Sequence, residues 1–168
     1  YVGTSNLKGW SVPFEEQSRD TWRDTLEVNL TAPFIMIQAF TKILRESKNS
    51  SVINIGSIRG MLGVDMKLYE GTKMGSSIAY SASKGGLLQM TRYLATVLAP
   101  DIRVNSISLG GIARNQNELF TKRYIDSTPL GRMGKEEDTK GAAVYLASDL
   151  SEYVTGHNLV LDGGWVSW

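Results

Sequence analysis

Short runs rich in β-branched residues alternate with longer helical patterns along this chain, and that alternation limits the folds open to it. The runs that predict buried strands are SVINIGS at Ser51–Ser57, IRVNSISL at Ile102–Leu109 and the shorter Leu159–Leu161. The predicted helices are Arg19–Ser47, Tyr80–Leu98 and Lys135–Ser148. Strands separated by helices form a parallel sheet. The sequence therefore predicts an α/β fold, with residues 1–168 as a single domain.

The first predicted helix is long and carries a proline in its interior. Ser18 is a candidate N-cap. Apolar residues recur at spacings of three and four and predict one buried stripe: Trp22, Leu26, Leu30, Phe34, Ile37, Phe40 and Leu44. Because Pro33 lacks a backbone N–H, we expect a kink near Asn29 or an unpaired carbonyl there.

The segments between the predicted elements are loops or weak helices. Residues 1–17 and 58–79 contain several glycines without a clear period and are predicted as loops. The polar stretch that follows Gly110-Gly111 has weak helical character as far as Thr128. Asp162-Gly163-Gly164 predicts a tight turn after the last strand.

Composition excludes several classes of function. Hydrophobic residues make up 42% of the chain, charged residues 21%, and the net charge is +1, with no basic block for nucleic acid. The chain has no cysteine, and its one histidine, His157, reads as a strand-edge residue, so we expect no metal site. No apolar run reaches the ~18 residues of a membrane span. The start YVGTSNLKGW lacks the apolar region of a signal peptide, which favours a cytoplasmic location.

A tyrosine and a lysine open the second predicted helix four residues apart. Tyr80 and Lys84 therefore lie on one helix face. A nearby cation favours the phenolate of a tyrosine, whose ordinary pKa is about 10, and a phenol so tuned can exchange a proton with a hydroxyl or carbonyl. Tyr69 and Lys73 have the same spacing, but the glycines that follow secure no helix there. The helical context thus favours Tyr80 and Lys84, with Tyr69 as the rival.

With these motifs in order, the chain resembles the classical short-chain dehydrogenase/reductase family from its first residues to its last. The segments that carry the resemblance are VNL around Asn29, INIGSIRG at 53–60, YSASKGG at 80–86, IRVNSISLGGI at 102–112, PLGRMGKEED at 129–138 and YVTGHNLVLDGG at 153–164. The resemblance implies a Rossmann-type doubly wound parallel sheet, an NAD or NADP cofactor, a small-molecule substrate and a homotetramer.

The resemblance also implies roles for individual residues. Tyr80 is expected as the general acid/base, and Lys84 to lower the pKa of Tyr80 and bind the nicotinamide ribose. Ser57 is expected to hydrogen-bond the substrate oxygen, and Asn29 to hold a water of the proton relay. The residues expected to bind the cofactor are Tyr80, Lys84, Leu109, Gly110 and Ile112.

Three features depart from the family pattern. The glycine-rich turn of T-G-x-x-x-G-x-G type is absent, so we expect the C-terminal portion of a family member, without the leading strands that hold the cofactor's phosphates. Ser57 and Tyr80 are 23 positions apart, more than the family's usual spacing, so residues 61–77 are interpreted as a lengthened substrate loop. Arg114 replaces a threonine that often contacts the cofactor, and is either a partner for a phosphate or carboxylate or a surface charge.

The leading prediction is an NAD(P)-dependent oxidoreductase that moves hydride between nicotinamide and a carbonyl/alcohol pair. The segment LYEGTKM at 68–74 is similar to members of bacterial flagellin-modification and surface-sugar clusters, which makes a sugar derivative the first expectation for the substrate. One alternative is a sugar-nucleotide epimerase or dehydratase, which also uses Y-x-x-x-K. The other is a non-catalytic scaffold subunit. The four tryptophans are interpreted as packing or interface residues.

Overall fold

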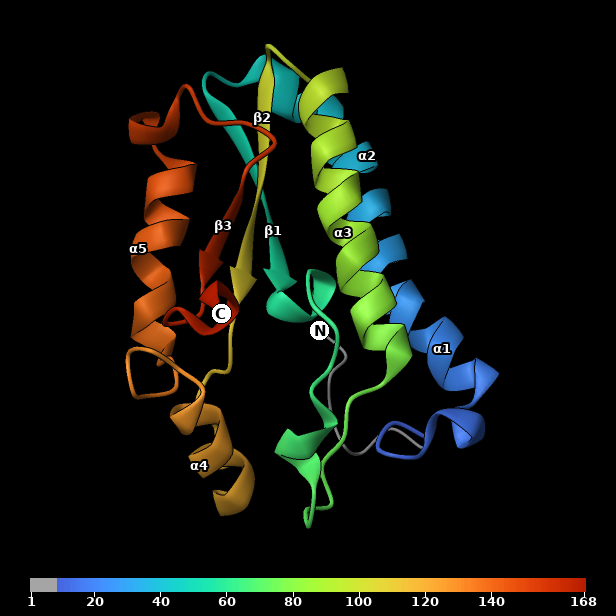
Figure 1. Cartoon of the computed structure of the whole chain (residues 1–168). Helices are drawn as coiled ribbons and strands as arrows, with labels where there is room; N and C mark the ends of the chain where they lie inside the picture. The colour runs from blue at the N-terminus through green and yellow to red at the C-terminus, as the bar shows by residue number, and fades with distance from the viewer. Residues whose placement is uncertain (1–8) are drawn as a thin grey trace.

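A parallel sheet lies at the centre of the computed structural model, which describes residues 9–168 (Figure 1). Its strands are β1 (Ser50–Ser57), β2 (Ile102–Leu109) and β3 (Asn158–Leu161), in the order β1-β2-β3. Each predicted strand is confirmed to within one residue. The predicted α/β class with a parallel sheet is therefore confirmed, and the part of the expected N-terminal loop at residues 1–8 lies outside the described residues.

Helices cover both faces of this sheet, as in a doubly wound fold. The helices α2 (Ala32–Glu46) and α3 (Ile78–Val97) lie on one side, and α5 (Glu136–Ala147) lies on the other (Figure 1). The side chains of β2 alternate between the two layers: Val104 packs with α2 and α3, whereas Ile107 packs with α5. In the part of the chain that the structure describes, no helix is long and apolar enough to cross a membrane.

The predicted first helix is continuous but changes its hydrogen bonding in the middle. Its parts are α1 (Arg19–Leu26), a π-helical segment (Glu27–Thr31) and α2 (Ala32–Glu46). The N–H of Ala32 donates to the carbonyl of Glu27, five residues earlier. Pro33 has no N–H to give to Asn29, four residues before it. The distortion expected near Asn29 therefore takes the form of a π-helical turn.

The prediction of one buried apolar stripe on that helix is confirmed for Ile37, which belongs to the core, but is wrong for three other residues. Trp22, Phe34 and Phe40 are 38%, 47% and 53% exposed. The residues buried along the α1 and π-helical part are polar: Thr21, Thr25 and Asn29. This face packs against α3, where Gly86 makes room for the side chain of Leu30; a Cβ on Gly86 would lie 2.9 Å from that side chain. Periodicity located an apolar stripe, but the neighbouring helix decides which face is covered.

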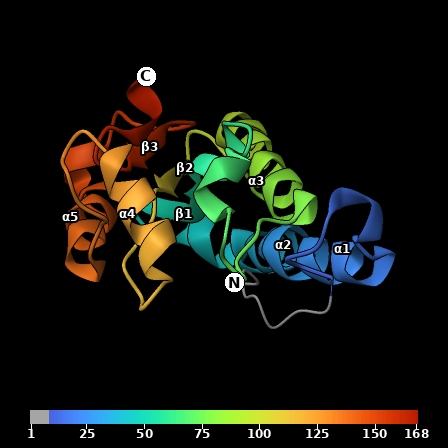
Figure 2. The ribbon, with the colours of Figure 1, turned by 60° about the horizontal axis from the view of Figure 1, so that its bottom comes forward.

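A separate layer covers the end of the sheet at which the strands terminate. It contains α4 (Glu118–Asp126) and the residues 61–77, which include a short 3₁₀ helix at Met66–Tyr69 (Figure 1). The buried apolar side chains of this layer are Leu68, Phe120, Tyr124 and Met133. Figure 2 turns this end toward the viewer, with α4 and α5 on one side of the strands and α1–α3 on the other. The helical character expected before Thr128 is thus a regular helix with its own core.

Asn105, fully buried inside β2, holds the segment that leads into β3. Its side-chain amide donates to the carbonyl of Val154 at 2.8 Å, and its side-chain oxygen accepts from the N–H of His157 at 3.0 Å. After β3, Gly163 and Gly164 have φ of +69° and +89°, which glycine adopts without strain. The predicted turn after the last strand is confirmed.

Candidate active site

The strand register brings three chain segments to one edge of the sheet. Ser57 at the end of β1 pairs with Leu109 at the end of β2, and Leu109 pairs with Leu161 at the end of β3. In open α/β sheets, ligands bind in the crevice beyond the carboxyl ends of the strands. A candidate site therefore lies where the segments after Ser57, Leu109 and Leu161 leave the sheet together.

Tyr80 and Lys84 lie in the first turns of α3, as the sequence predicted. The helix is capped by Ser77, whose Oγ accepts the N–H of Ala79 at 3.1 Å. Tyr80 is half-buried and meets Trp10 edge to face, with ring centroids 5.8 Å apart. The Nζ of Lys84 lies 5.9 Å from the centroid of the Tyr80 ring, so the cation and the phenol are neighbours.

Lys84 is a buried cation tied to the sheet. Its side chain is 5% exposed, and its Nζ donates to the carbonyl oxygen of Ile55 at 2.8 Å. Burial lowers the pKa of Lys84, because removal from water disfavours the charged form. The hydrogen bond fixes the ammonium close to the end of β1, beside the segment that carries Ser57.

Asn29 is joined to the same region of α3. It is 3% exposed in the π-helical segment, and its Nδ2 donates to the Oγ of Ser83 at 3.2 Å. The Oγ of Ser83 in turn donates to the carbonyl of Tyr80 at 2.8 Å. Asn29 is thereby held next to the turn of α3 that contains Tyr80 and Lys84.

Ser57 ends β1 and begins a short 3₁₀ turn, Ile58–Gly60. Its side chain is buried, and its Oγ accepts the N–H of Arg59 at 3.2 Å. This turn packs directly on α3: a Cβ on Gly60 would lie 2.7 Å from the carbonyl carbon of Lys84. The structure therefore brings all four residues expected to be catalytic into one region at the end of β1.

The rival pair, Tyr69 and Lys73, is not held on one helix. The 3₁₀ helix ends at Tyr69, and the chain turns before it reaches the exposed Lys73. The Tyr69 ring packs on Phe120, with centroids 5.4 Å apart, inside the layer formed with α4. This geometry gives Tyr69 a packing role.

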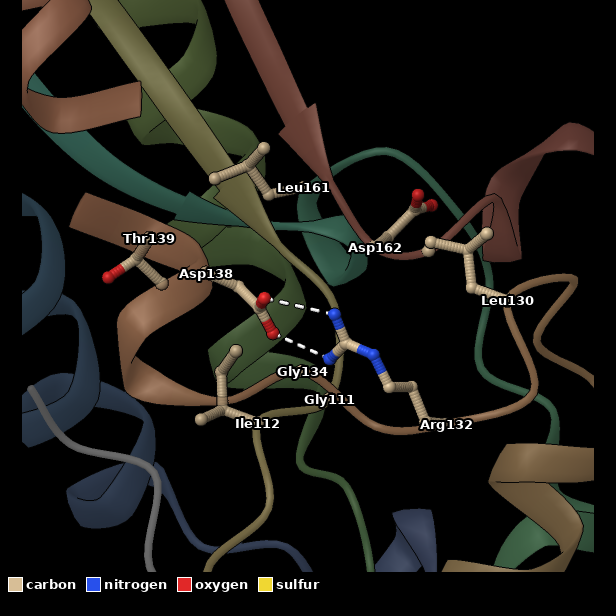
Figure 3. A pocket seen from close by; sticks show the side chains of 10 residues that line it. Gly111, Ile112, Leu130, Arg132, Gly134, Asp138, Thr139, Leu161 and Asp162 are labelled. Atoms are coloured by element: carbon tan, nitrogen blue, oxygen red, sulfur yellow. Dashed lines mark hydrogen bonds and ion pairs between the residues drawn. The ribbon is translucent and has the colours of Figure 1, made fainter. Parts of the chain in front are cut away.

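A pocket lies beyond β2 and β3, and its lining does not include Tyr80 or Lys84 (Figure 3). Its volume is about 170 Å³, below the ~300–1,000 Å³ of sites that enclose a whole small ligand. The ten residues that line it are Gly111, Ile112, Leu130, Arg132, Gly134, Asp138, Thr139, Leu161, Asp162 and Gly163. It can take one ring or one small group of a larger ligand.

The residues expected to bind the cofactor fit its nicotinamide end. Ile112 lines the pocket, and Leu109 ends the strand that leads to it. Gly110 is required by packing, since a Cβ there would lie 2.8 Å from the Cα of Asp162. Together with the phenol and ammonium of Tyr80 and Lys84, this region suits the nicotinamide and its ribose. The sequence has no glycine-rich turn to hold the phosphates.

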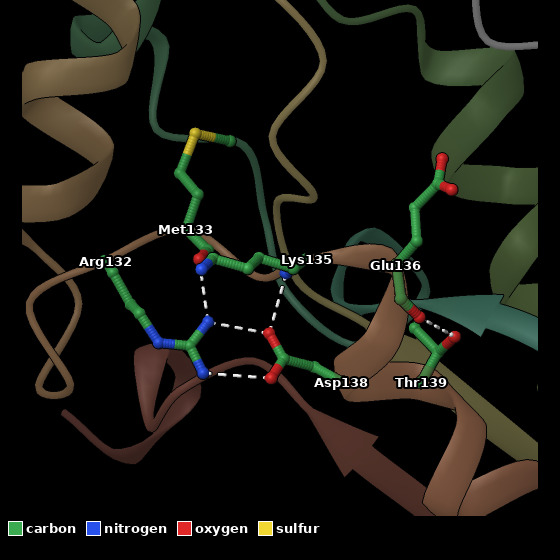
Figure 4. A network of polar contacts seen from close by, with 6 residues as sticks. All are labelled: Arg132, Met133, Lys135, Glu136, Asp138 and Thr139. Atoms are coloured by element: carbon green, nitrogen blue, oxygen red, sulfur yellow. Dashed lines mark hydrogen bonds and ion pairs between the residues drawn. The ribbon is translucent and has the colours of Figure 1, made fainter.

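One wall of the pocket is fixed by an ion pair that the sequence reading had not singled out (Figure 4). The Nη1 and Nη2 of Arg132 donate to the two carboxylate oxygens of Asp138 at 2.6 and 2.9 Å. The N–H of Lys135 also donates to Asp138, at 2.7 Å. The Arg132 hydrogen bond and the Lys135 N–H lower the pKa of Asp138 to about 2. The pair joins the loop after Leu130 to the first turn of α5.

Arg114, the other position that departs from the family pattern, lies at the surface. Its Nη2 is 2.7 Å from Oε1 of Glu136, and both side chains are mostly exposed. This contact supports the surface-charge interpretation of Arg114 over a role in the site. Within residues 9–168, no group of three or more His, Cys, Asp or Glu side chains is arranged to hold a metal ion.

Sequence reasoning also missed Arg59 and its aromatic neighbours. Arg59 is 8% exposed, and its guanidinium lies 5.4 Å from the centroid of the Trp165 ring. Trp165 stacks on Tyr124, with centroids 5.6 Å apart, and the Tyr124 hydroxyl accepts the N–H of Gly111 at 2.6 Å. The available signal was the position of Arg59, two residues after Ser57 at the ligand edge of the sheet.

Comparison with known proteins finds a matching family model and similar proteins. The family model described as "Enoyl-(Acyl carrier protein) reductase" matches residues 2–166. The chain is 34% identical over 160 residues to post-translational flagellin modification protein A of Campylobacter coli, covering 94% of this chain and 62% of that protein. It is 37% identical over 159 residues to 5-keto-D-gluconate 5-reductase of Escherichia coli, covering 90% of this chain and 59% of the relative.

A solved structure has the same fold. The short chain dehydrogenase from Leptospira borgpetersenii with bound NAD+ matches with a TM-score of 0.85 and 42% sequence identity, covering 94% of this chain and 62% of that chain. The chain thus spans about three-fifths of the length of these relatives. The likeness to flagellin-modification proteins predicted from the sequence is confirmed.

Proposed function

The chain belongs to the short-chain dehydrogenase/reductase family, and from that premise we propose that the protein containing it is an NAD(P)-dependent oxidoreductase. It interconverts a carbonyl and an alcohol on a small molecule. The observation that carries the proposal is the cluster at the end of β1, where Lys84, tied to Ile55, lies beside Tyr80. The named relatives are a reductase and a dehydrogenase, which favours this reading over a scaffold subunit.

Each residue of the cluster has a distinct task in this proposal. Nicotinamide, when bound, supplies or accepts the hydride. Tyr80 gives a proton to the substrate oxygen during reduction and removes it during oxidation. The Lys84 ammonium favours the Tyr80 phenolate and holds the ribose hydroxyls. Ser57 binds the substrate oxygen, and Asn29 positions a water through which the proton is exchanged with solvent.

A sugar derivative is the substrate class that the relatives support best. The Escherichia coli relative is named for 5-keto-D-gluconate, and the Campylobacter coli relative for flagellin modification. The layer formed by residues 61–77 and α4 covers the end of the sheet where such a substrate meets Tyr80 and Ser57.

The decisive experiment uses full-length protein and a nicotinamide cofactor deuterated at C4. Consumption of the cofactor in step with a sugar-derived ketone, with deuterium recovered at the new carbinol carbon, is the expected result. An epimerase or dehydratase converts its substrate with no net change in the cofactor. Absence of any cofactor-linked conversion over a panel of ketoses and keto acids would leave a non-catalytic subunit as the better description.

The protein is also expected to assemble with copies of itself. Exposed apolar side chains lie along the outer side of α2 and α3: Phe34, Met36, Phe40, Ile43, Tyr93 and Val97. Apolar surface of this extent usually marks an interface. Family resemblance supplies the expected form, a tetramer in which these helices pair across a two-fold axis.

A further inference from the structure

Arg59 is a buried cation for which residues 9–168 provide no counter-ion. Its side chain is 8% exposed. Within the part of the chain that the structure describes, its one hydrogen bond from the side chain runs from Nη1 to the carbonyl oxygen of Gly63, at 3.2 Å, and no carboxylate forms an ion pair with it. Two of its three nitrogens therefore donate to no described group. A buried charge is costly unless it is paired.

Asp162, a carboxylate in this part of the fold, is already engaged. Asp162 and Arg59 both act electrostatically on Tyr124, whose pKa burial raises. The oxygens of Asp162, however, accept the N–H groups of Gly164 and Val166, each at 2.8 Å. Asp162 stabilises the turn after β3, and no oxygen of it lies in ion-pair contact with Arg59.

A second donor beside Arg59 is also left without an acceptor. The Trp165 ring lies over the guanidinium, and its Nε1 is buried with no hydrogen-bond partner in the described structure. Buried polar groups are almost always satisfied, so an orphaned donor calls for an explanation. Guanidinium and indole N–H groups can only donate. The missing partner is therefore an acceptor, and next to a cation it is an anion.

The location and the charge identify the kind of anion. Arg59 follows Ser57 by two residues at the ligand edge of the sheet, and Trp165 follows the end of β3. None of the groups in contact with Arg59 adds a second positive charge. One guanidinium balances a singly charged carboxylate, to which its planar fork is matched. A phosphate dianion would leave one negative charge unbalanced beside Arg59.

We propose that Arg59, together with the Nε1 of Trp165, binds the carboxylate of the substrate, which makes that substrate a hydroxy acid or keto acid rather than a neutral sugar. The inference rests on the proposed oxidoreductase function and specifies its substrate. Arg59 and Trp165 determine specificity, whereas Ser57 and Tyr80 bind the reacting oxygen. The carboxylate neutralises Arg59 and satisfies the indole N–H when it enters.

The test compares two probes that differ only at one carbon. L-sorbose is 5-keto-D-gluconate with the carboxylate replaced by a hydroxymethyl group. Each is titrated calorimetrically into full-length protein saturated with oxidised cofactor, in which the ketone binds without turnover. The wild-type protein is expected to bind 5-keto-D-gluconate about tenfold to a hundredfold more tightly than L-sorbose. Hydrogen bonds to a charged group usually contribute a difference of this size.

Three variants of the proposed site and one control separate binding from folding. Arg59→Met should abolish the preference for the acid, and Arg59→Lys should retain part of it because the charge remains. Trp165→Phe keeps an aromatic ring, loses the N–H, and should reduce the preference severalfold. The control, Arg92→Met, removes an exposed arginine on α3 whose Nε donates to Gln89, and should leave the preference unchanged.

The outcomes are distinct. Equal binding of both probes by wild type, or an undiminished preference in folded Arg59→Met, overturns the carboxylate assignment. If Arg59→Met does not fold, the preference for the acid is measured in Arg59→Lys and Trp165→Phe instead. An unchanged preference in both variants would also overturn the carboxylate assignment. If the protein prefers the acid but reduces no ketone at the expense of the cofactor, the carboxylate-binding site stands and the proposed oxidoreductase function is wrong.

Discussion

The ammonium of Lys84 lies 2.8 Å from the carbonyl oxygen of Ile55, so a hydrogen bond near the site joins the helix that carries Tyr80 to the strand that ends in Ser57. The bond also directs the cation toward the ligand edge of the sheet. Because both partners belong to rigid elements, the relative positions of Tyr80 and Ser57 are set before any substrate arrives. Such preorganisation is what a proton-transfer site requires.

Replacement of Tyr80 by phenylalanine should abolish most of the activity. The ring and its contact with Trp10 remain, but the proton donor is lost, so kcat should fall by about 10²- to 10⁴-fold. Tyr69→Phe is the matched control, because Tyr69 packs on Phe120 and has no proposed role in proton transfer. Steady-state kinetics of the full-length protein provide the measurement. A larger loss in Tyr69→Phe would reverse the assignment.

Gly60→Ala should destabilise the protein through the contact between the turn after Ser57 and α3. A Cβ at Gly60 would lie 2.7 Å from backbone of Lys84, which must then move. Overpacking of this kind costs about 1–3 kcal/mol of unfolding free energy. Gly63→Ala, whose Cβ would meet nothing within 4 Å, is the control. Urea denaturation compares the two; equal midpoints would contradict the packing described for this turn.

The Arg132–Asp138 pair should give a stability difference that depends on pH in a defined direction. The folded-state pKa of Asp138 is lowered to about 2 from an ordinary 3.8. Its contribution is therefore fully present above 3.8 and is lost as the pH falls through about 2. The gap in melting temperature between wild type and Asp138→Asn should be constant near neutral pH and shrink in strong acid. Asp126→Asn, which removes an exposed partner of Lys122, should have a smaller effect.

The 168 residues alone should bind NAD(P) weakly. They contain candidate contacts for the nicotinamide end, but no glycine-rich turn at a helix N-terminus for the phosphates. Calorimetric titration of the isolated chain should detect no micromolar binding, whereas the full-length protein should bind. Micromolar affinity in the isolated chain would show that the phosphate turn is dispensable.

Charges introduced on the outer side of α2 should weaken self-association. Phe34 and Phe40 are about half-exposed, and glutamates there would be buried without partners in an interface. Light scattering coupled to size exclusion should find a tetramer for the wild-type protein and smaller species for the double variant Phe34→Glu/Phe40→Glu. Leu150→Glu, at an 80% exposed position on another part of the surface, is the control. A monomeric wild type would refute the expected assembly.

The sequence predicted the sheet well because each strand is a self-contained β-branched run. β2, predicted as Ile102–Leu109, has those bounds in the structure. The exposure of the first helix could not be predicted in the same way. Apolar spacing identifies a stripe, but the packing of the helix on α3 decides which residues are covered, so Thr21 and Thr25 are buried while Phe34 is exposed.

The residues of the candidate site differ in the same way in how well the sequence predicted them. Tyr80 and Lys84 were visible because their spacing on a helix is local, and the family motifs directed attention to Ser57 and Asn29. The wall formed by Arg132 and Asp138, and the contact between Arg59 and Trp165, depend on where loops from three strands meet. No local sequence pattern predicts such contacts between residues that are far apart in the sequence.

The π-helical turn at Glu27–Thr31 has a consequence for genetic change in this protein. Each residue of an α-helix advances the chain by about 100° around the axis. Deleting one residue of this turn would let the N–H of Ala32 donate to a carbonyl four residues earlier, which restores regular α-helical hydrogen bonding. The wider π turn absorbs the extra residue, so α1 and α2 would keep nearly the same faces and Thr21 and Thr25 would stay buried against α3. A single-codon deletion that falls in this turn and spares Asn29 should therefore be tolerated better than one inside α1 or α2, which would rotate the flanking helix by about 100°.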